Sequence, residues 1–389
     1  MPLRIYLEQI DLTKNYDIVV IGAGLSSLMF LSRYILNNKN QSILLIEKKN
    51  KNSINQTFCI WQGPGLINIQ KTYHLKPRYI WNKIEVSYEN KSICKNIRPY
   101  TYQCFDGKET LKNLLKQCKG KIDFKQGLDV LKIKNNKDSI EIICSNLTIH
   151  SKYLIDSRNT IEKKQYEFAP SLRQAFIGNE IISETEKFNP QVLKLMEFIK
   201  NKKDIQFTYT LPFSKNKALV ETTIFSKKPS FFNIKKLQKQ ALSQYKKFKS
   251  IKEEKGVIPM TLYRELVNNN NLPIGLPAGM ARPSTGYSMM RIAQWVNSIE
   301  KKKIKNNNIE EFQFQPNNIL NWFDSIFLTV CFFWPHRVPS LFMKLFGNAD
   351  IKSIIRFMSD APTSKDIIFI ILSMPKKHMI QGLIRKYVK

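Results

Sequence analysis

The feature that most constrains this chain lies near its start, where YDIVVIGAGLSSLMFLSRYIL is followed, after five intervening residues, by SILLIEKKN. An apolar run, a glycine turn, a segment with apolar residues at helical spacing and a second apolar run ending in an acid are typical of the opening β-α-β unit of a Rossmann-type dinucleotide site. Gly22 permits the tight turn, Gly24 lets a pyrophosphate approach the backbone, and Ser27 is small enough for close helix packing. Glu47 ends the second run, where it can bond a ribose hydroxyl. We therefore expect a bound dinucleotide rather than a structural unit without a ligand.

The overall charge indicates an anionic partner. The 389 residues include 62 Lys and Arg against 31 Asp and Glu, a formal net charge of +31, although part of this excess accompanies a general richness in Lys, Asn and Ile. Such a surplus attracts nucleic acid or a phospholipid surface. The chain has no zinc-knuckle, RNA-recognition or Arg-rich signature, so we expect no nucleic acid. Four histidines and six scattered cysteines without a CxxC pair lead us to expect no metal site.

One acidic residue stands in an apolar strand pattern. NKALVETTIF, residues 216–225, reads as a half-buried strand rich in β-branched and aromatic residues. Strand alternation puts Glu221 on the same face as Leu219, Thr223 and Phe225. A carboxylate there is costly unless it is paired, or unless its pKa rises and it stays protonated. Glu221 is therefore either an acid kept protonated for chemistry or a structural glutamate, bonded to a backbone amide or to an arginine such as Arg264.

Several distant segments together resemble one enzyme family. They are, in chain order, NQTFCIW (55–61), YLIDSRN (153–159), LRQAFIG (172–178), YTLPFSKNKALVETTIF (209–225), EEKGVIPMTL (253–262) and AGMARPSTGYS (278–288). In this order and spacing they are similar to the lycopene cyclases, the flavoprotein-like carotenoid cyclases of bacteria, cyanobacteria and plants, and the likeness is to the bacterial β-cyclases in particular. The family commonly has a histidine where this chain has Arg282, so an acid or base role at that position is not expected.

The resemblance implies a reaction and its cofactors. The substrate would be lycopene, or a related linear carotenoid with ψ ends. The sequence leaves open a β, ε or γ ring and cyclisation of one or both ends, and the likeness to the bacterial β-cyclases favours β-ionone rings. Protonation of the terminal double bond gives a cation, the ring closes on it, and a proton leaves without net redox change. The resemblance also implies FAD in its reduced form, with NAD(P)H as the electron source, so that an anionic flavin stabilises the cation.

The resemblance further implies roles for individual residues. LVETT falls on the family segment that bears an essential acid, so Glu221 would be the proton donor. A helix beginning near Thr285 or Gly286 would face the flavin ring with its N-terminus. Further cofactor contacts are implied at Asp156, Gly279, Pro283, Thr285 and Gly286, and an apolar substrate tunnel would be lined by Trp61, Phe213, Phe225 and Tyr287.

The implied fold is mixed α/β (α+β), an FAD-binding Rossmann-type fold of the glutathione-reductase and aromatic-hydroxylase kind with an inserted β-sheet substrate domain. We expect the FAD-binding domain to comprise residues 15–60, 105–175 and 256–300, and the substrate domain to comprise 61–104 and 179–255. Residues 314–389 would form a helical, membrane-associating tail.

The expected location follows from the substrate and the tail. Lycopene dissolves only in bilayers, and the apolar runs IFLTVCFFW and IIFIILSM are too short to cross one. The first 17 residues carry acids and no apolar h-region, so we expect no targeting peptide. Peripheral attachment to the cytoplasmic face of a membrane is expected, through PSLFMKLF and IIFIILSM beside the cations Lys344, Lys352, Arg356, Lys376, Lys377, Arg385 and Lys386. An amphipathic helix packed on the core is the alternative reading.

Two other functions remain open from the sequence. One is a different FAD-dependent isoprenoid enzyme, a prenyl reductase or monooxygenase, in which the flavin turns over with NAD(P)H. The other is a non-enzymatic, basic peripheral membrane protein that retains the nucleotide unit. The sequence does not indicate an oligomeric state.

Overall fold

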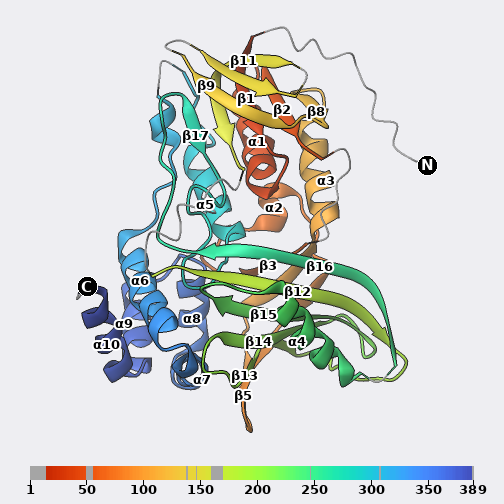
Figure 1. Cartoon of the computed structure of the whole chain (residues 1–389), viewed down its shortest axis with the longest axis vertical. Helices are drawn as coiled ribbons and strands as arrows, with labels where there is room; N and C mark the ends of the chain where they lie inside the picture. Colours follow the sequence, from red (N-terminus) through yellow and green to blue (C-terminus); the bar gives the residue numbers. More distant parts are fainter. Residues whose placement is uncertain are drawn as a thin grey trace.

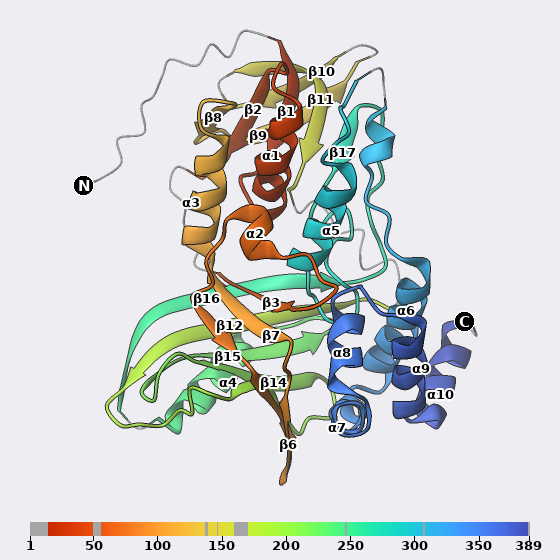
Figure 2. The same cartoon turned by 180° about the vertical axis from the view of Figure 1, so that it is seen from behind.

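A computed structural model describes residues 15–49, 56–136, 139–145, 147–158, 170–245, 247–305 and 308–387. Within these residues the chain forms two seven-stranded sheets, a three-stranded sheet and a C-terminal group of helices. In Figures 1 and 2 the first sheet and its helices lie above the broad second sheet, and the C-terminal helices lie at the side of the second sheet. The expectation that residues 1–14 belong to no targeting peptide lies outside the described residues.

The first sheet is built around the predicted nucleotide unit. Its central strand β1 pairs in parallel with β2 on one side and β11 on the other, as the sequence predicts for a Rossmann-type unit. Apolar residues of β1 are buried on both faces of the sheet, which is why this strand reads as a continuous apolar run. The strand order is β8 (Asp123–Gln126), β2 (Ile43–Glu47), β1 (Tyr16–Ile21), β11 (Thr148–Asp156), β10 (Ile140–Cys144) and β9 (Val130–Asn135), and β17 (Asn271–Pro273) pairs with the end of β11.

Helices cover one face of this sheet. Leu28, Met29 and Leu31 of α1 pack in one apolar core with Ile18 and Val20 of β1. A second core on the opposite face includes residues of β9 and β10. The helices on the first face are α1 (Leu25–Asn37), α2 (Ile69–Tyr73), α3 (Gly107–Cys118) and α5 (Met289–Ile299).

The second sheet carries the segment that contains Glu221. Its long strand β12 lies between β15 and β16 and pairs antiparallel with both. Helix α4 (Phe231–Ser243) packs on one face, through Ile234 against Ala175 and Ile224. The strand order is β16 (Phe248–Met260), β12 (Leu172–Ser183), β15 (Lys217–Ser226), β14 (Ile205–Pro212), β13 (Leu193–Ile199), β5 (Lys83–Tyr88) and β6 (Lys91–Asn96).

A small sheet lies where the first and second sheets meet. It consists of β3 (Thr57–Gln62), β7 (Thr101–Asp106) and β4 (Tyr79–Trp81). The domain boundaries expected at residues 60, 104, 175 and 255 fall inside β3, β7, β12 and β16. The division into an FAD-binding and a substrate domain remains a prediction.

The C-terminal helices pack against the second sheet. Leu328 and Phe342 of these helices share one core with Phe198 and Phe207 of the sheet. No single helix among the described residues is long and apolar enough to cross a membrane. Two pairs of consecutive helices have the length and composition of a membrane span when each pair is taken together, but each pair is sharply bent: α6 with η3–α7 by 108°, and α9 with α10 by 104°. The elements are η2 (Ile309–Phe312), α6 (Asn318–Phe333), η3 (Pro335–Arg337), α7 (Val338–Asn348), α8 (Ile351–Met358), α9 (Ser364–Ser373) and α10 (Lys376–Tyr387).

Candidate active site

The glycine turn after β1 opens toward a cavity. Gly22 has φ +91°, a left-handed conformation, and a Cβ at that position would lie 2.4 Å from Ser157 Oγ. A Cβ on Gly24, the N-cap of α1, would have no atom within 4 Å. Gly24 and the first residues of α1 line the cavity, so the helix N-terminus faces open space. Open space in front of a helix N-terminus suits a phosphate group.

The other predicted residues of the nucleotide unit lie around this turn. Glu47 accepts a hydrogen bond from the Ala23 amide (2.8 Å), which puts its carboxylate beside the turn. Asp156 ends β11 and forms an ion pair with Arg158 (2.7 Å). Ser27 is fully buried in α1, and its hydroxyl has no hydrogen-bond partner among the described residues. Glu47, Asp156 and Ser27 are not among the residues that line the cavity.

The loop before α5 borders the same cavity and corrects one prediction. The helix begins at Met289, not near Thr285 or Gly286. Thr285 and Gly286 donate their amides to the carbonyl of Arg282 in a turn, and Gly286 has φ +73°, which a helix does not allow. The turn itself therefore lines the cavity, together with Met289 and Ile292 of the first turn of the helix.

The remaining predicted residues of this loop play other parts. Gly279 has φ +73° and lies against Arg264, whose Cβ would be 3.1 Å from an added Cβ. Pro283 is buried, and neither Gly279 nor Pro283 lines the cavity. Gln174, which does line it, has an Oε1 atom without a hydrogen-bond partner among the described residues, 2.4 Å from where a Cβ on Gly286 would lie. An unpaired buried acceptor beside a glycine without a side chain fits a site that receives a polar ligand.

The cavity extends from the glycine turn to the second sheet. Its volume is about 490 Å³. Phe225 and Tyr287 line it, as predicted, together with Phe207. Trp61 and Phe213, which were also predicted to line the substrate tunnel, do not line this cavity: Trp61 packs edge-on against Tyr102, and Phe213 packs against Trp81 beneath the Arg78 guanidinium. Trp61 is buried in an apolar core, and Phe213 is partly buried against the same core.

Three tyrosines connect the two sides of the cavity wall. The Tyr209 hydroxyl donates to the Tyr102 hydroxyl (2.9 Å), which lies 3.2 Å from that of Tyr287. Burial raises the pKa of all three phenols, so they are neutral. The wall therefore combines apolar rings with a chain of neutral hydroxyl groups.

Glu221 points into this cavity from β15. Its side chain is buried, and its Oε1 accepts a hydrogen bond from the Thr223 hydroxyl (2.9 Å). Arg264 donates instead to the Phe314 carbonyl (2.8 Å) and to Gln315, so the proposed structural pairing with Arg264 does not occur. Burial and the neighbouring Glu254 raise the pKa of Glu221 to about 8. Glu221 is therefore protonated at neutral pH.

Glu254 is a functional candidate that the sequence does not reveal. It lies on β16, lines the cavity and accepts a hydrogen bond from the Thr57 hydroxyl (2.8 Å). Its segment, IKEEKG, reads as an exposed, charged strand, and only the tertiary structure shows that one of its two glutamates is buried. The available signal is Gly178, a glycine inside the strand pattern LRQAFIG, since such a glycine often marks a close approach.

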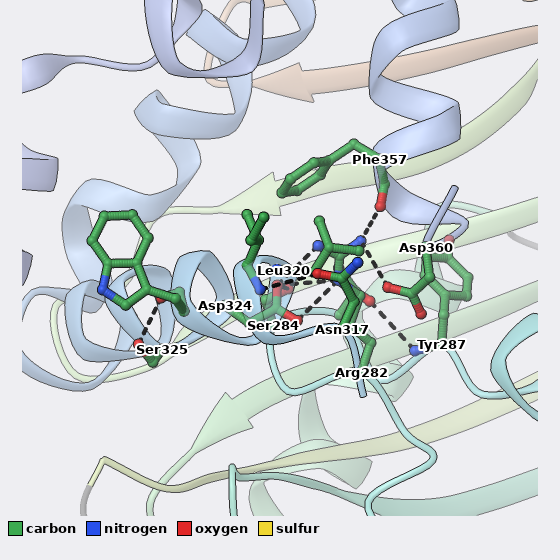
Figure 3. Close-up of polar contacts among 12 residues, drawn as sticks. Arg282, Ser284, Tyr287, Asn317, Leu320, Asp324, Ser325, Phe357 and Asp360 are labelled. Atoms are coloured by element: carbon green, nitrogen blue, oxygen red, sulfur yellow. Dashed lines mark hydrogen bonds and ion pairs between the residues drawn. The ribbon is translucent and has the colours of Figure 1, made fainter. Parts of the chain in front are cut away.

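Arg282 lies behind the cavity and does not line it. Its guanidinium is fully buried and contacts Asp324 of α6 (3.0 Å), the carbonyl of Phe357 and Asp360 (3.7 Å), as Figure 3 shows. The Ser284 hydroxyl also donates to Asp324 (2.7 Å). The residue at the position of the family histidine therefore holds the cavity-lining loop to the C-terminal helices.

Comparison with known proteins points to one family. The family model described as lycopene cyclase protein matches residues 17–383. A lycopene beta cyclase of Narcissus pseudonarcissus is 26% identical over 235 residues, which cover 54% of this chain and 45% of that protein. One of Solanum lycopersicum is 27% identical over 188 residues, covering 42% and 36%. The matches thus span less than half the length of these relatives.

Solved structures share the fold at low identity. A geranylgeranyl bacteriochlorophyll reductase-like protein of Thermoplasma acidophilum has a TM-score of 0.63 at 13% identity, covering 96% of this chain and 99% of that one. A flavoprotein/dehydrogenase of Cytophaga hutchinsonii has a TM-score of 0.60 at 12% identity, covering 95% and 100%. The halogenase PltM, solved with phloroglucinol and FAD, has a TM-score of 0.55 at 11% identity, covering 95% and 92%. The predicted fold class, a Rossmann-type fold of the FAD-binding kind, is confirmed.

Proposed function

The chain belongs to the lycopene cyclase family, and from this premise we propose that it converts the linear ψ ends of lycopene, or of a related carotenoid, into β-ionone rings. The reaction is an isomerisation without net redox change. One observation carries the proposal: a carboxyl group that stays protonated at neutral pH faces a cavity with aromatic walls. The names of the two curated relatives support the β ring.

Glu221 is the proposed proton donor. Protonating an alkene requires an acid aimed at a carbon atom, and the cation that forms must meet no water. Burial keeps the proton on Glu221, and the carboxylate left behind after transfer is an unshielded anion beside the new cation. The aromatic rings of Phe207, Phe225 and Tyr287 line the cavity, and an aromatic ring can stabilise a nearby cation through its π face.

FAD is the proposed cofactor, with NAD(P)H as the source of its electrons. The open space at Gly24 and the N-terminus of α1 suits the pyrophosphate, and Glu47 suits a ribose hydroxyl. The unpaired Gln174 Oε1 beside Gly286 suits the flavin ring. Reduced FAD, when bound, would supply a fixed negative charge near the carbocation.

The direct test is expression in cells that accumulate lycopene and lack a cyclase, followed by product chromatography. We expect β-carotene from the unaltered chain, no ring formation with Glu221→Gln, and severe impairment with Glu221→Asp. Glu253→Gln changes an exposed glutamate of the same sheet, on β16 one position away from the residue in register with Gly178 and Glu221, and serves as the matched control. Near-normal cyclisation by a Glu221→Gln protein that retains FAD would show that the proton comes from elsewhere.

A flavin-dependent reductase or monooxygenase is the second candidate, because the same fold occurs in a geranylgeranyl reductase-like protein. A reductase consumes one NAD(P)H for each double bond that it reduces, whereas a cyclase only maintains a reduced flavin. Parallel measurement of NAD(P)H oxidation and product therefore separates the two. A purified chain without flavin and without product would instead favour a non-enzymatic binding protein.

We also propose peripheral attachment to an anionic membrane surface, at the cytoplasmic face. PSLFMKLF does not contribute as expected, because Leu341, Phe342 and Phe346 of α7 are buried. Arg356 is paired with Asp366. Support comes from α6, α9 and α10, whose exposed apolar side chains are Ile319, Trp322, Ile368, Phe369, Ile371, Leu372, Ile380, Ile384 and Tyr387, with Lys376, Lys377 and Arg385 exposed nearby in the chain. An apolar surface flanked by cations suits an anionic leaflet.

A further inference from the structure

Glu254 is a buried carboxyl group that proton donation by Glu221 does not use. We propose that Glu254 is the base that removes the proton from the cyclised cation and returns it to Glu221, so that the two carboxyl groups work as a pair holding one proton. This inference rests on the proposed cyclase function and extends it to the last step of the reaction.

The two carboxyl groups can approach each other because the strand between them, β12, has a glycine at this position. Gly178 of β12 is the register partner of Glu221 on β15 and of Glu254 on β16. A Cβ on Gly178 would lie 3.2 Å from Glu221 Cβ and 3.2 Å from Glu254 Cγ. With no side chain at Gly178, the two carboxyl groups face each other across the intervening strand, and Glu254 lies close enough to raise the pKa of Glu221. Both line the same cavity.

Their surroundings assign different protonation states. Burial raises the pKa of Glu254 as well, but the hydrogen bond from the Thr57 hydroxyl and the Lys252 ammonium, 3.8 Å from Oε2, oppose that rise and favour the ionised form. Glu221 accepts a hydrogen bond from the Thr223 hydroxyl, and no cation among the described residues lies within ion-pair distance of it. When the pair holds a single proton, that proton therefore resides on Glu221, and Glu254 is the available base.

The other charged groups around the pair form ion pairs of their own, and the other titratable groups are neutral. Lys252 also contacts Asp106 of β7 (3.5 Å). Glu180 of β12 is held by Arg78 and Lys217 (2.6 and 3.0 Å). The groups facing the pair from neighbouring elements are Lys252 of β16, Asp106 of β7, Glu180 of β12, Tyr209 of β14 and Cys59 of β3, of which burial keeps the last two neutral.

The proton and electrons balance within the pair. The O–H bond of Glu221 breaks as a C–H bond forms at the terminal alkene, and the second alkene closes the ring on the resulting cation. A ring C–H bond then breaks, its electrons form the ring double bond, and the proton goes to Glu254. In a β ring, the carbon that gains a proton and the carbon that loses one are both bonded to the same ring carbon. They therefore lie close together, and two adjacent carboxyl groups can reach both of them. Transfer from Glu254 to Glu221 restores the starting state.

The test is the pH dependence of kcat for lycopene cyclisation by the FAD-loaded enzyme. The unaltered enzyme should give a bell-shaped profile, because only the singly protonated pair is active. Glu254→Gln should lower kcat by about 100-fold or more and abolish the limb that rises with pH, while FAD content and KM remain unchanged. Glu254→Asp should keep the rising limb at reduced kcat, and the exposed Glu253→Gln should match the unaltered enzyme.

A second variant covers the case in which Glu254→Gln does not fold. Thr57→Val removes the hydrogen bond to ionised Glu254, which raises the pKa of that group and should move the rising limb to higher pH. A kcat of Glu254→Gln within about threefold of the unaltered enzyme, or an unmoved rising limb in Thr57→Val, would overturn the assignment of Glu254. Absence of ring formation by the unaltered enzyme would instead overturn the proposed function.

Discussion

At the scale of single residues, the properties of Glu221 depend on what lies on the strands beside it. The apolar face of β15 buries the carboxyl group, and the missing side chain of Gly178 admits a second carboxyl group from β16. Ionising both carboxyl groups would place two negative charges close together in a buried site, which is energetically unfavourable, so one of the two groups keeps its proton. The same arrangement has a consequence for stability.

We predict that Glu221 lowers the stability of the fold as the pH rises. The pKa of this group is about 8 in the folded chain against 4.5 for an unperturbed glutamate, so between these values the folded state binds more protons than the unfolded state. The free energy of unfolding must then fall with increasing pH over that window. Each pKa unit corresponds to about 1.4 kcal/mol, so the loss attributable to Glu221 is a few kcal/mol.

Urea denaturation at pH 5.5 and pH 8.5 measures this effect. Glu221→Gln cannot titrate and should lose less stability between the two pH values than the unaltered chain. Glu253→Gln, at an exposed position, should behave like the unaltered chain. Equal losses in Glu221→Gln and the unaltered chain would mean that Glu221 is already ionised at neutral pH.

At the scale of elements, the N-terminus of α1 and the loop before α5 form two walls of the same cavity. Gly22 is required by its left-handed backbone and by Ser157, whereas Gly24 is required only by what occupies the open space in front of it. A side chain at Gly22 is therefore excluded by the backbone conformation, whereas a side chain at Gly24 is excluded by the ligand.

Gly24→Val should abolish FAD binding while the chain still folds. Nothing within 4 Å obstructs a Cβ at this position, so the fold tolerates a side chain that would occupy the phosphate space. Glu47→Gln should weaken FAD binding less, since one charge-assisted hydrogen bond contributes about 1.5–3 kcal/mol. Flavin absorbance of the purified protein and its far-ultraviolet circular dichroism report the two properties. A Gly24→Val protein with one flavin per chain would exclude this turn as the phosphate site.

The loop before α5 is held from behind by a buried ion network. Arg282 and Arg291 contact Asp324 of α6 and Asp360 after α8, and all four side chains are almost completely buried. Asp324→Asn removes a negative charge that balances the buried positive charge of Arg282, and it should destabilise the fold by about 3 kcal/mol. Because asparagine keeps only one acceptor oxygen for both Arg282 and the Ser284 hydroxyl, the loop should loosen and FAD should dissociate faster. A change in unfolding free energy below about 1 kcal/mol would contradict this role for the network.

At the scale of the whole molecule, the C-terminal helices have two opposite faces. One face closes the core of the second sheet and contributes Phe342 and Met358 to the cavity wall. The other, on α9 and α10, exposes apolar side chains such as Leu372, which is 62% exposed. A tail that contacts both the cavity and the surrounding medium is suitably located to receive a bilayer-dissolved substrate.

Flotation with liposomes tests the proposed membrane surface. The chain should bind vesicles that contain anionic lipid at low salt, bind neutral vesicles less, and lose binding as salt increases. The double substitution Ile368→Ser with Leu372→Ser should weaken binding. Phe232→Ser, which removes a 79% exposed aromatic side chain from α4, should not. Equal binding to neutral vesicles would contradict the electrostatic contribution, and unchanged binding of the double variant would contradict the surface itself.

Features that are encoded in contiguous residues could be predicted from the amino-acid sequence. The β-α-β unit was predictable because its apolar runs, glycines and terminal acid follow one another within a single stretch of chain. The unusual position of Glu221 was predictable because alternation along one strand needs no knowledge of the neighbouring strands. The family was predictable because several motifs recur in a fixed order.

Features that depend on pairing between distant segments became visible only in the folded chain. Glu254 meets Glu221 only through the register of three strands that lie up to 76 positions apart in the chain, and a shift of one residue would turn either carboxyl group to the opposite face. The start of α5 was set by a left-handed glycine, and the inward orientation of α7 by the core that it closes. Local patterns show that a residue is buried, but the partner it is buried against is selected by long-range packing, which no single stretch of sequence contains.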